Sequence, residues 1–137
     1  MTVVAVSSST VHSAAMAAGV GFLLVAGFQV ALALGAPWGR AAWGGANEGR
    51  LPRNLRIASA VAAVVWILLA SLIFAVAGHE LIPLPFSVPD WVPWALFGLS
   101  LLGALMNLAS KSRWERLLWS PVAAILALLC LVVALGS

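Results

Sequence analysis

The chain has 137 residues, of which 64% are hydrophobic and only 8% are charged. A soluble globular domain carries about 25% charged residues, so this chain cannot cover its surface with polar groups and must be solvated by a lipid bilayer. The net charge of +3 comes from seven basic residues, and membrane topology explains their placement better than nucleic-acid binding does. The length fits a single membrane domain, residues 1–137.

Four apolar stretches are long enough to predict membrane-spanning helices, at about 11–34, 55–77, 92–109 and 117–135. A spanning helix needs roughly 20 apolar residues. The stretches are too long for strands and do not alternate apolar with polar residues. The first twelve residues contain no Lys or Arg, so we expect the first stretch not to be a cleaved signal. The predicted fold class is all-α, a bundle of four transmembrane helices.

The basic residues predict the orientation of this bundle. Four arginines lie between the first two helices, and Lys111, Arg113 and Arg116 lie between the last two. The two ends of the chain and the segment 78–90 contain none. By the positive-inside rule, residues 35–54 and 110–117 are cytoplasmic and both termini are extracytoplasmic. The predicted location is the cell membrane, as a multi-pass protein.

The first connector is rich in glycine, proline, tryptophan and arginine. Trp38 and Trp43 suit the headgroup layer, so one interpretation is a rigid loop anchored at the interface. The alternative is a lipid-phosphate or anion site, because glycine-rich backbone presents N–H groups and arginines supply charge. The candidate anion-binding residues are Arg40, Arg50, Arg53 and Arg56. No nucleotide-binding spacing accompanies them.

Four further tryptophans are predicted interfacial anchors. Trp91 and Trp94 follow a proline-rich segment, 78–90, that we expect to be irregular. Trp114 and Trp119 belong to a short amphipathic lead-in to the last helix. The charged residues of that lead-in are interpreted as a solvated edge facing the lipid.

A few polar residues interrupt the apolar helices at similar depth. They are Gln29, Ser59, Asn107 and Ser120. One interpretation is a polar clamp between helices, worth about 0.6–2 kcal/mol. The other is the floor of a polar cavity.

The residues that could carry chemistry are sparse. His12 and His79 are predicted at the outer ends of neighbouring helices, where two imidazoles could ligate haem or a transition metal. No metal-ligand spacing joins them, and no acid is positioned for a catalytic triad. Cys130 is interpreted as a small buried apolar residue. We therefore predict no cofactor and no catalytic residue.

Several short motifs resemble a known group. The elements are Gly-Ala-Pro-Trp-Gly at 35–39, Trp-Gly-Gly at 43–45, Leu-Pro at 51–52, Leu-Arg at 55–56, Asn107, Ser-Lys-Ser at 110–112 and Glu-Arg at 115–116. They resemble a recurring group of small, uncharacterised bacterial four-helix membrane proteins, which implies the fold but no activity. The small multidrug resistance family also has four helices, but its proton coupling depends on a glutamate in helix one, and residues 11–34 contain no acid.

Three function classes remain open. The sequence favours a non-enzymatic membrane component that binds lipid or a protein partner, or that forms a homo-oligomer. A small transporter or channel subunit is the first alternative, disfavoured because no buried charge is expected among the predicted helices. A haem- or metal-binding redox protein is the second. Expected partners are the bilayer, anionic lipid, and a second copy or another membrane protein, but not nucleic acid.

Overall fold

The computed structural model of the protein describes residues 6–137, and within this range every regular element is helical. The four main helices are α1 (Ser8–Ala33), α2 (Arg53–Val76), α3 (Val92–Leu108) and α4 (Ser120–Gly136). Two short 3₁₀ turns, Gly39–Ala41 and Trp43–Gly45, lie in the first connector, and a π-helical turn, Glu115–Trp119, leads into α4. The predicted all-α fold class is confirmed.

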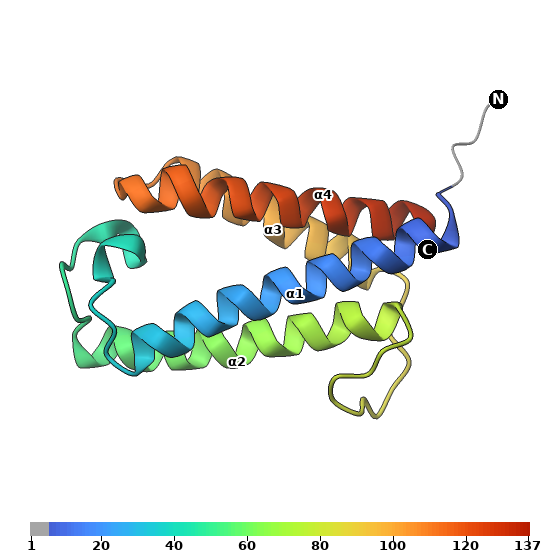
Figure 1. Cartoon of the computed structure of the whole chain (residues 1–137), viewed down its shortest axis with the longest axis horizontal. Coiled ribbons are helices and arrows are strands. Elements are labelled where there is room, and N and C mark those ends of the chain that lie inside the picture. The colour runs from blue at the N-terminus through green and yellow to red at the C-terminus, as the bar shows by residue number, and fades with distance from the viewer. Residues whose placement is uncertain (1–5) are drawn as a thin grey trace.

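The four helices form two antiparallel hairpins (Figure 1). The hairpin α1–α2 packs against the hairpin α3–α4 mainly through α1 and α4, whereas α2 and α3 hardly touch. The two hairpins lie closest together where α4 ends, and residues 39–45, teal in Figure 1, lie between them at the other end. All seven Lys and Arg are in the two connectors or in the first turn of α2, at that second end, which we call the basic end.

Glycines end the first two helices. Gly35 has φ +102° and Gly78 has φ +82°, a left-handed conformation that glycine adopts without steric cost. Beyond each glycine the next N–H bonds back across the last helical turn, from Ala36 to Ala31 O at 2.9 Å and from His79 to Phe74 O at 3.0 Å. This is the Schellman arrangement, which satisfies carbonyls that the helix leaves free.

A π-helical turn joins the α3–α4 connector to α4. Pro121 has no N–H, so Leu117 O cannot receive the ordinary α-helical hydrogen bond. The Ser120 N–H instead bonds to Glu115 O, five residues back, which is the π-helical pattern. The chain therefore enters α4 as a continuous helix, and the wider turn carries Glu115 and Trp119.

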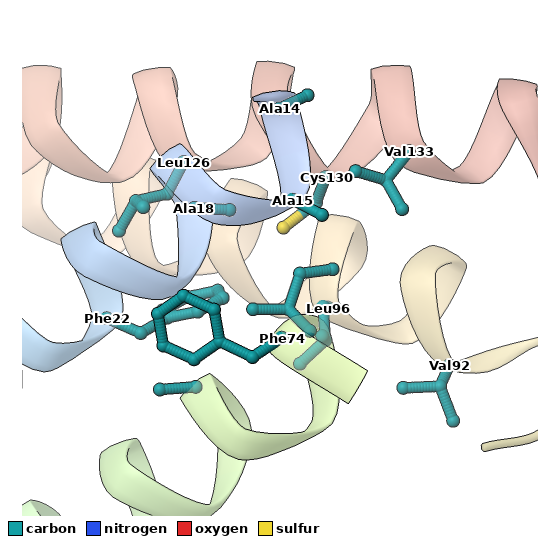
Figure 2. Packing of buried hydrophobic residues seen from close by; sticks show 12 residues of the cluster. Ala14, Ala15, Ala18, Phe22, Phe74, Val92, Leu96, Leu126, Cys130 and Val133 are labelled. Atoms are coloured by element: carbon teal, nitrogen blue, oxygen red, sulfur yellow. The ribbon is translucent and has the colours of Figure 1, made fainter. Parts of the chain in front are cut away.

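The main hydrophobic core fills the half of the bundle opposite the basic end. Figure 2 shows side chains from all four helices meeting there, among them Phe22, Phe74, Leu96 and Cys130. Close packing depends on small residues of α1. A Cβ at Gly19 would lie 2.4 Å from the Phe74 ring, so only glycine allows α2 to approach α1 this closely. This half of the bundle is solidly packed.

The outer surface is apolar over most of its length. Three helical segments, Ser8–Ala33, Arg53–Val76 and Glu115–Gly136, are long and apolar enough to cross a membrane, and Val92–Leu108 is a shorter apolar helix. Large apolar side chains such as Leu24, Val61, Leu105 and Leu128 are exposed on them. A lipid bilayer would cover these side chains, so the helices fit a small polytopic membrane protein.

Candidate binding cavity

A cavity of about 640 Å³ lies between the two hairpins, in the half nearer the basic end. Its walls come from α1, α3 and α4, with Trp66 of α2 at one side and the segment 39–45 at its end. The lining residues are Val25, Phe28, Gln29, Ala41, Ala42, Trp43, Gly44, Trp66, Leu99, Ser100, Gly103, Met106, Asn107, Ser110, Glu115, Trp119, Val122, Ala123 and Leu126. Most of the lining is apolar, and the polar groups are few.

Residues 39–45, which we call the cap, close the cavity at the basic end. Three consecutive residues have left-handed backbone, Trp43 with φ 51°, Gly44 with φ 79° and Gly45 with φ 74°. Two of the three residues are glycines, which adopt this conformation at little steric cost. The turn places Trp43 in the wall of the cavity. Ala42 packs in a small cluster with Leu32 of α1. The cap is thus held against the α1–α2 hairpin.

Hydrogen bonds also tie the cap to both hairpins. Trp43 Nε1 donates to Ser59 Oγ of α2 at 2.9 Å. On the other side, the Gly44 N–H donates to Glu115 Oε1 at 3.0 Å, and Ser112 Oγ donates to Arg40 O at 2.5 Å. Because its partners lie on both hairpins, the cap bridges them at the end where they separate.

Glu115 is the ionisable residue of the cavity lining. Its Oε1 accepts two hydrogen bonds, from the Gly44 N–H and from Ser110 Oγ at 2.6 Å. The neighbouring Arg116 is turned elsewhere, donating to Ser110 O at 2.9 Å and to Lys111 O at 3.0 Å. The sequence interpretation of this charged run as a solvated, lipid-facing edge was wrong for Glu115, since its carboxylate faces the cavity and the cap.

The predicted polar residues separate into two pairs. Gln29 and Asn107 both line the cavity, whereas Ser59 and Ser120 are buried outside it. Ser59 receives the Trp43 N–H, and Ser120 Oγ donates to the Ala104 carbonyl at 2.8 Å. The two serines therefore act as clamps between elements, and the two amides contribute polar groups to the cavity.

Three buried polar atoms of the cavity-lining residues lack a hydrogen-bond partner in the described part of the chain. They are Gln29 Oε1, Ser100 Oγ and Trp119 Nε1. A buried polar atom without a hydrogen bond costs about 1–3 kcal/mol, so most such atoms in folded proteins have partners. Ser100 adds a hydroxyl beside the Cys130 thiol. These atoms are available to a bound molecule.

A second, apolar groove lies beside the cavity, between α2 and α3. The groove is lined by Ala58, Val61, Ala62, Val65, Leu69 and three residues that also line the cavity, Trp43, Trp66 and Leu99. Val61, Val65 and Leu99 are exposed on the apolar surface. The weak contact between α2 and α3 thus leaves an apolar groove on the outer surface, beside the cavity.

The four predicted anion-binding residues have different surroundings: Arg40, Arg50, Arg53 and Arg56. Arg40 forms an exposed ion pair with Glu48, and Arg56 Nε donates to Ala33 O, at the end of α1, at 3.0 Å. Arg50 is exposed and its guanidinium lies over Gly35, and Arg53 is exposed at the start of α2. Lipid or anion binding by these four arginines stays a prediction.

The predicted tryptophan anchors also divide into two groups. Trp38, Trp91, Trp94 and Trp114 are exposed. Trp43 and Trp119 line the cavity, although Trp43 is also exposed on its outer side, and the Trp119 ring packs on Phe28 with 4.6 Å between ring centroids. Aromatic side chains therefore dominate the walls near the cap.

The two histidines lie next to each other, with 5.2 Å between ring centroids and both side chains exposed. Across residues 6–137, no group of three or more His, Cys, Asp or Glu side chains is placed to hold a metal ion. The haem or metal alternative therefore rests on this pair alone.

Three cavity features could not be read from sequence. Trp66 and Ser100 were not singled out as cavity residues, and Glu115 was assigned to the solvated charged run. A carboxylate five residues from a serine, in a connector that faces a glycine-rich loop, is the only signal that could have suggested Glu115. Comparison with protein families, curated proteins and solved structures gives no match to this chain, so the resemblance to small bacterial four-helix membrane proteins stays a prediction.

Proposed function

We propose that this chain is a non-enzymatic membrane protein that binds an apolar or amphipathic molecule in the cavity between its hairpins. The observation that carries the proposal is the cavity itself, about 640 Å³ with largely apolar walls and a few polar groups near the cap. Sites for small molecules have this size and this composition. The apolar groove between α2 and α3 shares Trp43, Trp66 and Leu99 with the cavity, and a ligand dissolved in the membrane would approach the cavity from this side.

The packed core favours binding over conduction. Phe22, Ile73, Cys130 and Val133 are fully buried in the half of the bundle opposite the cap, so the cavity has a closed inner end. A channel or transporter built from this chain would need a rearrangement of that core or a second copy. The proposed setting is the cell membrane with the basic end in the cytoplasm, which the distribution of Lys and Arg supports.

Cross-linking with a neutral amphiphile tests the proposal. The probe is a long-chain alcohol carrying a photoreactive diazirine, added to the protein in phosphatidylcholine nanodiscs. Gly103 lines the cavity, and the nearest atom to a Cβ placed there is Ala123 Cβ at 4.0 Å. Gly103→Phe therefore has room to fold and places its ring in the cavity.

Gly98→Phe is the matched control. Gly98 lies on the same helix, is exposed, and has no atom within 4 Å of an added Cβ. We expect cross-links at Trp119 and Asn107 in the wild type and in Gly98→Phe, and their loss in Gly103→Phe. Cross-links confined to outward-facing residues such as Leu128, or equal cavity labelling in both variants, would show that the cavity is not a binding site.

A further inference from the structure

We infer that the cavity takes an amphipathic organic cation, with the Glu115 carboxylate as its counter-charge and the aromatic walls around it. This inference rests on the proposed binding function and names the class of ligand. The ligand would place its charged nitrogen or phosphorus centre near the cap and its apolar body between the two hairpins.

The charge of the cavity is the first argument. Glu115 contributes a carboxylate, and Lys and Arg are absent from the cavity lining of the described chain. The carboxylate is held by two neutral donors, the Gly44 N–H and the Ser110 hydroxyl, while Arg116 is bound to backbone carbonyls. Glu115 is half-buried, and a carboxylate partly removed from water interacts more strongly with an opposite charge than it would in bulk water. A cationic ligand would supply the missing pair, and an anion would be repelled.

The aromatic walls are the second argument. Trp43, Trp66, Trp119 and Phe28 line the cavity, and Phe28 and Trp119 meet at a tilt of 50°. The face of an aromatic ring attracts a cation, tryptophan most strongly, and the attraction grows where water is excluded. These four rings therefore favour the same sign of charge that Glu115 favours.

Unpartnered polar atoms are the third argument. Gln29 Oε1 is a buried acceptor with no donor in the described chain. It can accept from the N–H of an amine, or face a permanent cation with its negative dipole. Trp119 Nε1 is a donor, and it could serve a hydroxyl or ether oxygen on the ligand. The Gln29 carbonyl oxygen and the Glu115 carboxylate therefore make the cavity more favourable for a positive than for a negative charge.

A pair of ions of equal shape and opposite charge tests the inference. Tetraphenylphosphonium and tetraphenylborate differ in the sign of their charge and little in size. Binding of each is measured by equilibrium dialysis against the full chain in phosphatidylcholine nanodiscs. The signal of the cavity-filled Gly103→Phe variant is subtracted, which removes partition into lipid.

Two glutamine variants then locate the charge. In Glu115→Gln the side-chain carbonyl oxygen can still accept from Gly44 and Ser110, so the cap contacts are kept. Glu48→Gln is the control, because Glu48 lies at the same end of the molecule but pairs with Arg40 outside the cavity. We expect cavity binding of the cation to be at least about ten-fold tighter than that of the anion, equivalent to about 1.4 kcal/mol. Glu115→Gln should remove most of this preference, and Glu48→Gln should leave it.

The outcomes separate this inference from the proposed function. Equal cavity binding of both ions, or an unchanged cation affinity in Glu115→Gln, overturns the inference and leaves the binding cavity standing. The comparison of the two ions on the wild type needs no variant of Glu115. The inference can therefore be overturned even if Glu115→Gln folds poorly. If neither ion binds more to the wild type than to Gly103→Phe, and the neutral alcohol also fails to label the cavity, the binding function falls as well.

Discussion

Replacing Gly45 with alanine should detach the cap from the α3–α4 connector. Gly45 has φ +74°, and a left-handed conformation costs a residue with a Cβ roughly 1–2 kcal/mol. The added Cβ would also lie 2.8 Å from Ser112 Cβ and 3.2 Å from Ser112 Cα. Forcing atoms into such a packed contact typically costs about 1–3 kcal/mol more.

Gly44→Ala separates the two contributions. Gly44 has φ +79° but no atom within 4 Å of an added Cβ, so its alanine variant bears the conformational cost without the steric one. The change in the unfolded chain is the same for both substitutions and cancels in the comparison. Gly45→Ala should therefore open the cap about 1–3 kcal/mol more easily than Gly44→Ala, which corresponds to about a 5- to 150-fold larger open fraction.

Cysteine labelling measures this opening directly. Ala42 is 5% exposed in the closed cap, so Ala42→Cys, with the buried Cys130 replaced by alanine, reacts with a maleimide only when the cap opens locally. The ratio of labelling rates between the two glycine variants gives the steric contribution. Equal rates, or faster labelling in Gly44→Ala, would refute the idea that close approach of Gly45 to Ser112 holds the cap in place.

Three further predictions concern topology, lipid and the cavity interior. In intact cells an impermeant thiol reagent should label a cysteine at position 87 but not at 47 or 113, and the opposite pattern would reverse the proposed orientation. Neutralising Arg50 and Arg53 together should reduce the anionic lipid retained in native mass spectrometry, because each arginine contributes about 1 kcal/mol to the binding free energy. The control is Arg40→Gln, whose arginine is already paired with Glu48, and it should retain nearly as much lipid as the wild type. Equal retention by all three proteins would remove this site. Gln29→Leu should leave the ligand-free protein as stable as the wild type or raise its free energy of unfolding by about 1–3 kcal/mol, because it removes a buried acceptor without a partner. Unfolding by SDS titration measures this stability. A clear loss of stability would mean that the amide has a structural role.

Much of the fold could be predicted because hydrophobicity and helix-ending residues are local signals. The apolar stretches predicted four helices, and the structure has helices at Ser8–Ala33, Arg53–Val76, Val92–Leu108 and Ser120–Gly136. Gly35 and Gly78 end the first two helices by adopting left-handed φ angles. This is a local property of glycine, so it can be predicted without knowing the rest of the fold. The irregular segment between α2 and α3 follows from its prolines in the same way.

The cavity could be predicted only in part. Gln29 and Asn107 were singled out because amides are conspicuous among apolar residues, and both line the cavity. The sequence could not tell that Ser59 and Ser120 lie outside it, since helix rotation is poorly specified when apolar residues surround the whole helix. Trp66 was missed for the same reason.

By itself the sequence determined an all-helical chain with apolar helices and all its basic residues in two connectors, because hydrophobicity and charge act residue by residue. Tertiary structure decided which of those residues meet. Close packing of α4 against α1, as at Gly136 beside Val11, holds the hairpins together at one end, and the left-handed turn of Trp43, Gly44 and Gly45 inserts the cap between them at the other. Only there does Glu115, 71 residues from Gly44 in the chain, receive the Gly44 N–H, and a contact at that separation depends on the packing of whole helices rather than on any local signal.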